Sequence, residues 1–279
     1  IVISPATAPY LLSHQVNGVV VVPLVLAQEW FLRAANAPGA APAYNTLRKL
    51  RVLKGIPLPA FSQRPTRLCI HLEPDGTEPG ALNATLYDAD GIARFAAQVS
   101  RGLAAPPPSA AVAASETWPA AHMAGAELYG AQLFHGPAFA TLQTVDRLGE
   151  HGARANLTGS QSVGWDAPRP LPLAPPWHTD PALIDGGLQL ARVWGFARLH
   201  QPTLPTAVAA FTVHEPGWLA PDRTVRCIVE GKPIGQTGTR TSLWFLDAAS
   251  GALIAEIHGL EMYRSSEAAP VPVQAGGAQ

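Results

Sequence analysis

The sequence predicts an α+β protein in which one long helix packed against an antiparallel sheet occurs twice. Two apolar segments with helical spacing lie far apart in the chain, several β-rich stretches follow each of them, and a stretch rich in Pro and Ala separates the two halves. Hydrophobic residues make up 47% of the 279 residues and charged residues only 14%. A chain of this length and composition can bury a large core.

The first half contains one helix and a series of strands. Residues 17–23 predict a short buried strand, because a run of valines is bounded by Gly18 and Pro23. A helix is predicted over residues 24–36, where apolar positions recur at helical spacing and Glu29 and Arg33 form an i,i+4 pair. The strands that follow are expected over residues 46–56, 66–72, 81–87 and 93–101.

Residues 104–118 are rich in Pro and Ala and predict a semi-rigid linker of the polyproline type. This linker separates an N-terminal repeat (residues 1–103) from a C-terminal repeat (residues 119–265). The tail, residues 266–279, lacks the residues that pack a core and is expected to be disordered. Because the chain starts at Ile1 and ends in such a tail, we expect a domain cut out of a larger polypeptide.

The second half repeats the pattern. Asp180 fits the N-cap and Pro181 the first position of a helix that extends to about residue 200. Its apolar residues cover more than one face, which favours a helix wrapped by a sheet. Strands are expected on both sides of this helix, over residues 140–147, 153–158, 207–214, 224–230, 241–246 and 253–263.

A short internal sequence similarity links the two halves. Residues 86–93 and 245–252 each form the end of a strand, an Asp-containing turn with glycine, and the start of the next strand. Two copies of a long helix against a curved antiparallel sheet indicate a duplication. The predicted fold class is therefore a double hotdog, two tandem hotdog repeats each with a long central helix.

Charge, apolar runs and cysteines exclude several classes of function. The net charge of −1 gives no electrostatic reason to expect nucleic-acid binding. No apolar run is long enough to span a bilayer. Cys69 and Cys227 lack metal-ligand spacing, which favours a reduced, cytoplasmic protein without a structural metal.

His14 lies directly before the valine-rich run of residues 19–22. An imidazole beside apolar residues is favoured in its neutral form, because burial lowers the pKa of histidine. A lone histidine of this kind is also common as an ordinary core or surface residue. His14 becomes a candidate catalytic base only if an acid lies near it, and the second predicted helix offers Asp185.

Four motifs resemble those of the dehydratase domains of polyketide and related multifunctional fatty-acid synthases, over about residues 8–264. They are His14-xxx-Gly18-xxxx-Pro23, Tyr129-Gly130 with Phe134-His135-Gly136-Pro137-Ala138-Phe139, the stretch from Asp180 to Gln189, and Leu204-Pro205. The amino-acid sequence of residues 26–31 and 52–56 is similar to that of iterative synthases of the polyunsaturated-fatty-acid and enediyne type. The sequence departs from the family at three positions, with Ser13 for an acidic residue, Asp180 for histidine and Val208 for an aromatic residue.

The resemblance implies dehydration of a β-hydroxyacyl thioester to the α,β-unsaturated thioester. His14 would be the base and Asp185 the acid, whose pKa should rise in an apolar groove. Gln189, one helical turn later, would hydrogen-bond the carboxyl group or the leaving hydroxyl. Gly18 would let the thioester approach backbone N–H groups near the start of the first predicted helix. The substrate-binding wall would also include Pro23, Tyr129, Gly136, Pro137 and Phe139.

No metal or diffusible cofactor is implied, because the substrate arrives on the phosphopantetheine arm of an acyl carrier protein. The expected partners are that carrier protein, neighbouring synthase domains and, as an alternative that the fold class allows, a second copy of the domain. His135 is interpreted as a structural residue, with a second titrating group at this position as the alternative. Two other functions stay open: a double-bond isomerase or cyclase with the same fold, and a non-catalytic scaffold domain that forms dimers.

Overall fold

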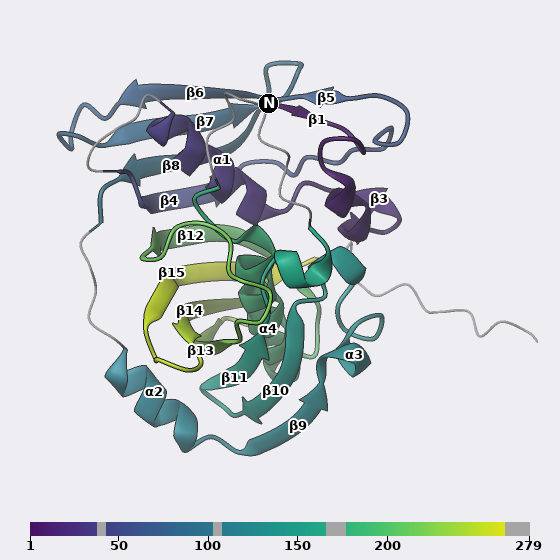
Figure 1. The fold of residues 1–279 in the computed structure, drawn as a ribbon, viewed down its shortest axis with the longest axis vertical. Coiled ribbons are helices and arrows are strands. Elements are labelled where there is room, and N and C mark those ends of the chain that lie inside the picture. Colours follow the sequence, from purple (N-terminus) through teal and green to yellow (C-terminus); the bar gives the residue numbers. More distant parts are fainter. Residues whose placement is uncertain (38–42, 103–107, 166–176, 266–279) are drawn as a thin grey trace, which may run out of the picture.

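The computed structural model describes residues 1–37, 43–102, 108–165 and 177–265 (Figure 1). In this part of the chain an antiparallel sheet of 11 strands has the order β6-β7-β8-β4-β12-β15-β14-β13-β11-β10-β9. Helices α1 (Leu24–Asn36) and α4 (Pro181–Leu199) contact each other and pack against this sheet. The double-hotdog prediction is confirmed, with one long helix and a share of the strands in each half.

The first half supplies one end of the sheet. Short segments precede helix α1: β1 (Val2–Ile3), the 3-10 helix η1 (Pro9–Ser13), β2 (Gln15–Val16) and β3 (Val19–Val20). The strands after α1 are β4 (Thr46–Val52), β5 (Thr66–Arg67), β6 (Cys69–Pro74), β7 (Leu82–Tyr87) and β8 (Ala93–Ser100).

The second half supplies the rest of the sheet. Its elements before α4 are β9 (Ala120–Ala124), α3 (Gly125–Leu128), η2 (Pro137–Phe139), β10 (Leu142–Leu148), β11 (Gly152–Leu157) and η3 (Gln161–Val163). The strands after α4 are β12 (Thr203–Val213), β13 (Val225–Ile234), β14 (Gly238–Asp247) and β15 (Leu253–Arg264).

Strands β4 and β12 join the two halves into one sheet. They pair antiparallel, with Leu47 opposite Phe211 and Arg51 opposite Ala207. Leu47 and Phe211 are fully buried, so this seam is part of the core rather than a surface contact. Backbone hydrogen bonds and apolar packing therefore fix the two halves of the chain relative to each other.

A buried carboxylate ties α1 to the segment that leads into α4. Glu29 accepts hydrogen bonds from the backbone N–H groups of His178 and Thr179 and from the Thr179 hydroxyl. The predicted contact with Arg33 is present, at 3.8 Å between Nε and Oε1. Burial raises the pKa of Glu29 to about 7, and these hydrogen bonds oppose the rise.

The duplication is visible in two equivalent hairpin turns. In the β7–β8 turn, Asp88 accepts backbone hydrogen bonds and Gly91 has a φ of 75°. In the β14–β15 turn, Asp247 accepts the backbone N–H of Ser250, and Gly251 has a φ of 73°. Each turn thus uses an aspartate acceptor followed by a glycine in the left-handed region.

Three local predictions are wrong. Residues 17–23 do not form one strand, because residues 17 and 18 have positive φ and turn the chain into the β2–β3 hairpin. Residues 109–116, expected in a polyproline-type linker, form helix α2 (Ser109–Glu116). The strand expected over residues 46–56 ends at Val52, after a bulge in its pairing with β8. Residues 104–107 and the tail lie outside the described residues.

The N-cap of α4 is confirmed and extends beyond the helix. Asp180 accepts hydrogen bonds from the backbone of Leu183 and Leu219, and from the backbone and hydroxyl of Ser160. Pro181 occupies the first helical turn. This side chain therefore fixes the start of the helix on which Asp185 lies.

Asp180→Ala is expected to lower the free energy of unfolding by about 2 kcal/mol or more, because it removes the cap and leaves buried donors unpaired. Urea unfolding followed by circular dichroism would measure the change. Asp180→Asn is the matched control, since it keeps a capping oxygen and should cost less. Equal stability of the wild type and Asp180→Ala would contradict this role.

Candidate active site

A cavity of about 140 Å³ lies between the two halves. Its apolar wall comes from both repeats, with Val22, Val52 and Phe95 from the first and Leu188 and Met262 from the second. The polar side chains on its wall are His14, His135, Asp185, Gln189, Arg192 and Thr203. An apolar cavity with a few converging polar groups is the usual form of a small-molecule site.

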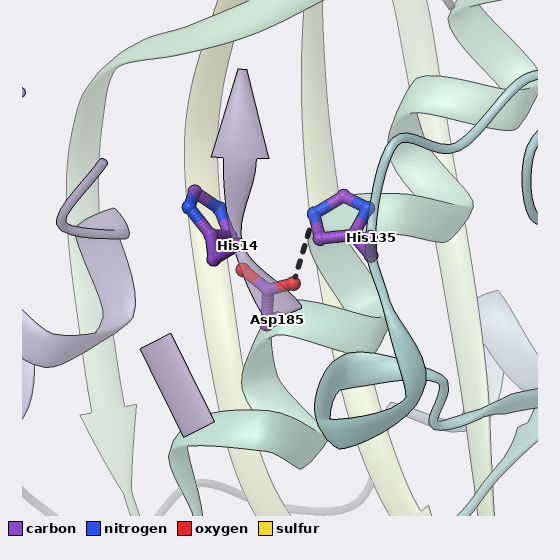
Figure 2. Close-up of side chains that lie close together, drawn as sticks. All are labelled: His14, His135 and Asp185. Atoms are coloured by element: carbon purple, nitrogen blue, oxygen red, sulfur yellow. Dashed lines mark ion pairs between the residues drawn. The ribbon is translucent and has the colours of Figure 1, made fainter. Parts of the chain in front are cut away.

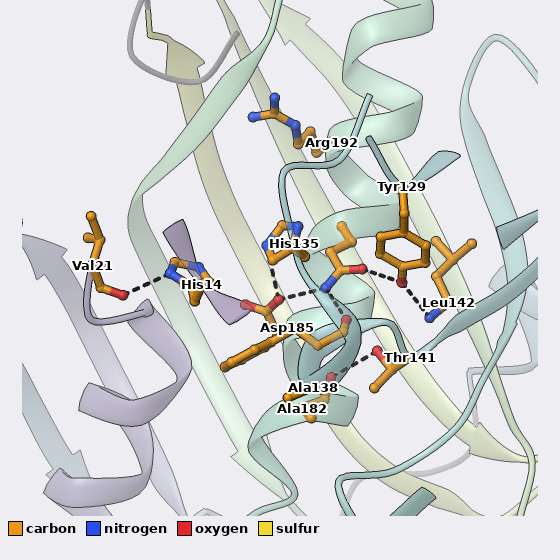
Figure 3. Close-up of polar contacts among 12 residues, drawn as sticks. His14, Val21, Tyr129, His135, Ala138, Thr141, Leu142, Ala182, Asp185 and Arg192 are labelled. Carbon is orange, nitrogen blue, oxygen red and sulfur yellow. Dashed lines mark hydrogen bonds and ion pairs between the residues drawn. The ribbon is translucent and has the colours of Figure 1, made fainter. Parts of the chain in front are cut away.

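His14 directly follows η1, and its side chain lines the cavity. Its Nδ1 lies 2.8 Å from the carbonyl oxygen of Val21, so Nδ1 carries the proton and Nε2 has the free lone pair (Figure 3). The backbone of Val21 also donates to the His14 carbonyl. Burial lowers the pKa of His14 to about 4. The imidazole is therefore a neutral base at neutral pH.

Asp185 lies on the second turn of α4 and is only 4% exposed. Burial raises its pKa to about 7, and a hydrogen bond from Gln189 opposes this rise. Nε2 of Gln189 donates to Oδ2 of Asp185 at 2.8 Å. A carboxyl group in this state holds a proton in a large fraction of molecules at neutral pH and can donate it.

Gln189 is held in one orientation by three further groups. Its Nε2 also donates to the carbonyl of Phe139, and its Oε1 accepts from the hydroxyl of Tyr129 at 2.8 Å. That hydroxyl in turn accepts from the backbone N–H of Leu142. These hydrogen bonds direct the amide N–H of Gln189 toward Asp185.

His135 lies beside Asp185, and the imidazole of His14 lies on the other side of that carboxyl group (Figure 2). Its Nε2 is 3.3 Å from Oδ2 of Asp185. Burial lowers the pKa of His135 well below its usual range, so this is a close contact with a neutral imidazole rather than an ion pair. The sequence analysis gave His135 a structural role, and the structure places it in the cavity.

Arg192 is a second cavity residue that the sequence analysis did not single out. It lies on the same face of α4 as Asp185, seven residues later, which is the signal that could have found it. Its guanidinium donates to the carbonyl groups of Gln132 and Thr203 and lies over the ring of Phe134. Burial lowers its pKa to about 10, which leaves it charged at neutral pH.

The structure brings together four of the predicted site residues. His14, Pro23, Asp185 and Gln189 line the cavity. Tyr129 does not line it, and it acts on the site through Gln189.

The other predicted positions lie outside the cavity wall. Gly18 is in the β2–β3 turn and borders a separate surface depression. Gly136 donates its N–H to the carbonyl of Ser13, and an added Cβ would lie only 3.1 Å from Ser13. Pro137 is exposed, and Phe139 packs behind His14 with ring centroids 5.3 Å apart. Gly136, Pro137 and Phe139 shape the loop that carries His135.

The fold and the site define a class of protein. It is a double hotdog in which a neutral histidine from one repeat and a carboxyl group of raised pKa from the other share an apolar cavity. Such a pair can remove a proton from one atom of a substrate and donate a proton to a neighbouring atom.

Comparisons with known proteins agree with this class. The family model "Polyketide synthase dehydratase N-terminal domain" matches residues 106–272, more than half of the chain. The chain therefore belongs to the polyketide synthase dehydratase family. No curated protein matches the sequence.

Solved structures show the same fold. The dehydratase domain from the CurJ module of curacin polyketide synthase superposes with a TM-score of 0.72 at 17% identity, covering 95% of this chain and 91% of that one. The dehydratase domain of a mycocerosic acid synthase-like polyketide synthase gives 0.75 at 19% identity, with 95% and 90% covered. No helix in the described part of this chain is long and apolar enough to cross a membrane.

Proposed function

We propose that this domain removes water from a β-hydroxyacyl thioester carried on an acyl carrier protein and yields the α,β-unsaturated thioester. The single observation that carries this proposal is the meeting of His14 and Asp185 in one apolar cavity. Ligand atoms of His14, His135 and Asp185 lie within 4.8 Å of one another. This spacing suits adjacent carbon atoms of one substrate.

The relatives give further support. A histidine-to-phenylalanine variant of the CurJ dehydratase and an aspartate-to-asparagine variant of the CurK dehydratase are both described as inactive. One histidine and one aspartate are the groups that the proposal assigns to this chain.

The reaction divides between the two groups. Nε2 of His14 takes a proton from Cα, and the electron pair of that C–H bond forms the Cα=Cβ double bond. The Cβ–O bond breaks, and the departing hydroxyl takes the Asp185 proton and leaves as water. The imidazolium and the carboxylate then exchange the proton, which restores both groups for the next turnover.

The thioester oxygen gains negative charge as the α-proton leaves. Leu24, the first residue of α1, lines the cavity, so the N-terminus of this helix lies at the wall. The first backbone N–H groups of α1 and the positive end of its helix dipole would stabilise that charge. The sequence led us to expect backbone donors near the start of this helix, whereas Gly18, expected to give access to them, does not line the cavity.

The synthase type and the partners belong to the same proposal. Val52 and Gly55 line the cavity. They belong to residues 52–56, whose sequence is similar to that of iterative polyunsaturated-fatty-acid and enediyne synthases. The phosphopantetheine arm of the carrier protein would deliver the acyl chain, and the residues of this chain need no other cofactor for the two proton transfers. Neighbouring synthase domains, a cytoplasmic location and pairing with a second copy complete the proposal.

Tyr129→Phe is expected to lower kcat by about tenfold with little change in KM. The substitution removes the hydroxyl that orients Gln189, and a lost hydrogen bond to an oriented polar group costs roughly 1–1.5 kcal/mol. Steady-state rates with a 3-hydroxyacyl pantetheine thioester measure the effect. Tyr87→Phe, outside the cavity, is the matched control and should keep the wild-type rate. An unchanged rate for Tyr129→Phe would remove Tyr129 from the site.

The test of the proposed function is incubation of the folded domain with 3-hydroxyacyl pantetheine thioesters of several chain lengths. Mass spectrometry should show the loss of one water from at least one of them. Since the reaction is reversible, the matching enoyl thioester should gain one water. No change in either direction by protein with a native circular dichroism spectrum would overturn the proposal.

A further inference from the structure

We propose that His14, His135 and Asp185 form a binding site for Zn²⁺, and that Zn²⁺ at this site blocks dehydration. The site goes beyond the proposed function, because its existence depends only on the three side chains. The blocking effect alone depends on dehydration.

The ligand set is the first argument. Two imidazoles and one carboxylate are a combination that binds first-row transition metals, whereas Mg²⁺ and Ca²⁺ prefer sites made of oxygen ligands. Figure 2 shows the three side chains converging from η1, from the loop before η2 and from α4. Among the described residues, they are the one group of at least three such side chains whose ligand atoms lie within 4.8 Å of one another.

The contacts behind the ligands are the second argument. Nδ1 of His14 bonds the Val21 carbonyl at 2.8 Å, which directs Nε2 to the site. Histidine ligands in proteins usually donate their other ring nitrogen to such an acceptor. Gln189 donates to Oδ2 of Asp185, which fixes the orientation of the carboxyl group. Hydrogen bonds with residues outside the ligand set thus already orient two of the three ligands.

The spacing requires a small closure. Tetrahedral Zn²⁺ with bonds of about 2.0–2.1 Å needs ligand atoms roughly 3.4 Å apart. Nε2 of His135 is already 3.3 Å from Oδ2 of Asp185. The remaining separations, up to 4.8 Å, must shorten by about an ångström or slightly more on binding. Three protein ligands leave a fourth position open toward the cavity.

Occupation by Zn²⁺ would use both groups of the proposed reaction. The lone pair on Nε2 of His14 would bind the metal and could not take a proton. Asp185 would bind as the carboxylate and could not donate one. Inhibition should therefore be complete at saturation and reversed by a chelator.

The test uses the folded domain with Co²⁺ as a spectroscopic probe and Zn²⁺ as the competing metal. We expect one Co²⁺ per chain, a visible d–d absorption of four- or five-coordinate type, and its loss when Zn²⁺ is added. Isothermal titration gives the Zn²⁺ affinity directly. His135→Gln and Asp185→Asn should each weaken that affinity by at least about 100-fold, since loss of an outer-shell partner alone costs roughly 10- to 100-fold.

His258→Asn is the matched control, because His258 pairs with Glu256 on the strand surface away from the cavity. It should keep the wild-type affinity. The proposal is overturned if the wild type binds no metal, or if His135→Gln and Asp185→Asn both bind like the wild type. Metal binding without any dehydration would leave this site standing and would overturn the proposed function instead.

Discussion

Replacing His14 with phenylalanine, or Asp185 with asparagine, is expected to lower kcat for dehydration by about 10²- to 10⁴-fold, the usual contribution of a general base or acid. His14→Phe keeps a ring against Phe134 and Phe139, whose centroids are each 5.3 Å from the imidazole. Asp185→Asn keeps the shape of the side chain. Both variants therefore remove a proton-transfer group with little change in volume.

The measurement is the rate of water loss from a 3-hydroxyacyl pantetheine thioester at saturating substrate. His122→Asn and Asp90→Asn, at exposed positions, are the matched controls and should keep the wild-type rate. The double variant should be about as slow as the slower single variant, because groups that act in one step do not contribute additively. Full activity of either single variant would show that its role is misassigned.

The pH dependence should follow from the two opposite pKa shifts. The active form has neutral His14 and protonated Asp185, and burial places their pKa values at about 4 and about 7. Activity should be highest between these values, fall tenfold per pH unit above about 7 as Asp185 loses its proton, and fall below about 4 as His14 gains one.

A kcat/KM profile from pH 5 to pH 9 measures the alkaline limb. Asp185→Asn has no proton to lose at this position, so its residual rate should lack that limb. A wild-type rate that stays constant up to pH 9 would contradict the assignment of Asp185 as the acid.

Stability should also depend on pH, mainly between the pKa of an aspartate in the unfolded chain, about 4, and the folded pKa of Asp185, about 7. The pKa of Asp185 is higher in the folded state than in the unfolded chain, so its contribution to stability is present at low pH and is lost as pH rises through about 7. Asp185→Asn should remove this loss and be more stable than the wild type at pH 9, by about 4 kcal/mol at most. Lower activity with higher alkaline stability separates catalysis from folding.

Much of the fold follows from local sequence rules. Helix α1 has the predicted bounds, and Asp180 and Pro181 start α4 as expected, because capping and helical spacing are set by neighbouring residues. The two hairpin turns that combine an aspartate with a glycine indicated the duplication, because turn residues also act locally. The β2–β3 hairpin was missed although Asn17-Gly18 is a strong signal for a two-residue turn.

The site could be predicted only in part. His14, Asp185 and Gln189 were found from motifs, and helical spacing explains why Gln189 meets Asp185. The placement of His135 depends on how its loop docks on Ser13, which accepts one hydrogen bond at its carbonyl group and one at its hydroxyl from backbone N–H groups far away in the chain. No local pattern encodes that contact. The same docking explains why Gly136, Pro137 and Phe139 support the cavity instead of lining it.

The most direct test of the central claim, that His14 is the base, uses a thioester with a carbon–carbon triple bond between Cβ and Cγ. His14 removes a proton from Cα, and the imidazolium that forms returns it to Cγ, which converts the compound into a conjugated allene. The neutral imidazole then adds covalently to Cβ of the allene. Peptide mapping by mass spectrometry should find the adduct on His14 in the wild type and in Asp185→Asn, and none in His14→Phe. An adduct on His135 in the wild type, or one formed equally in His14→Phe, would contradict the account.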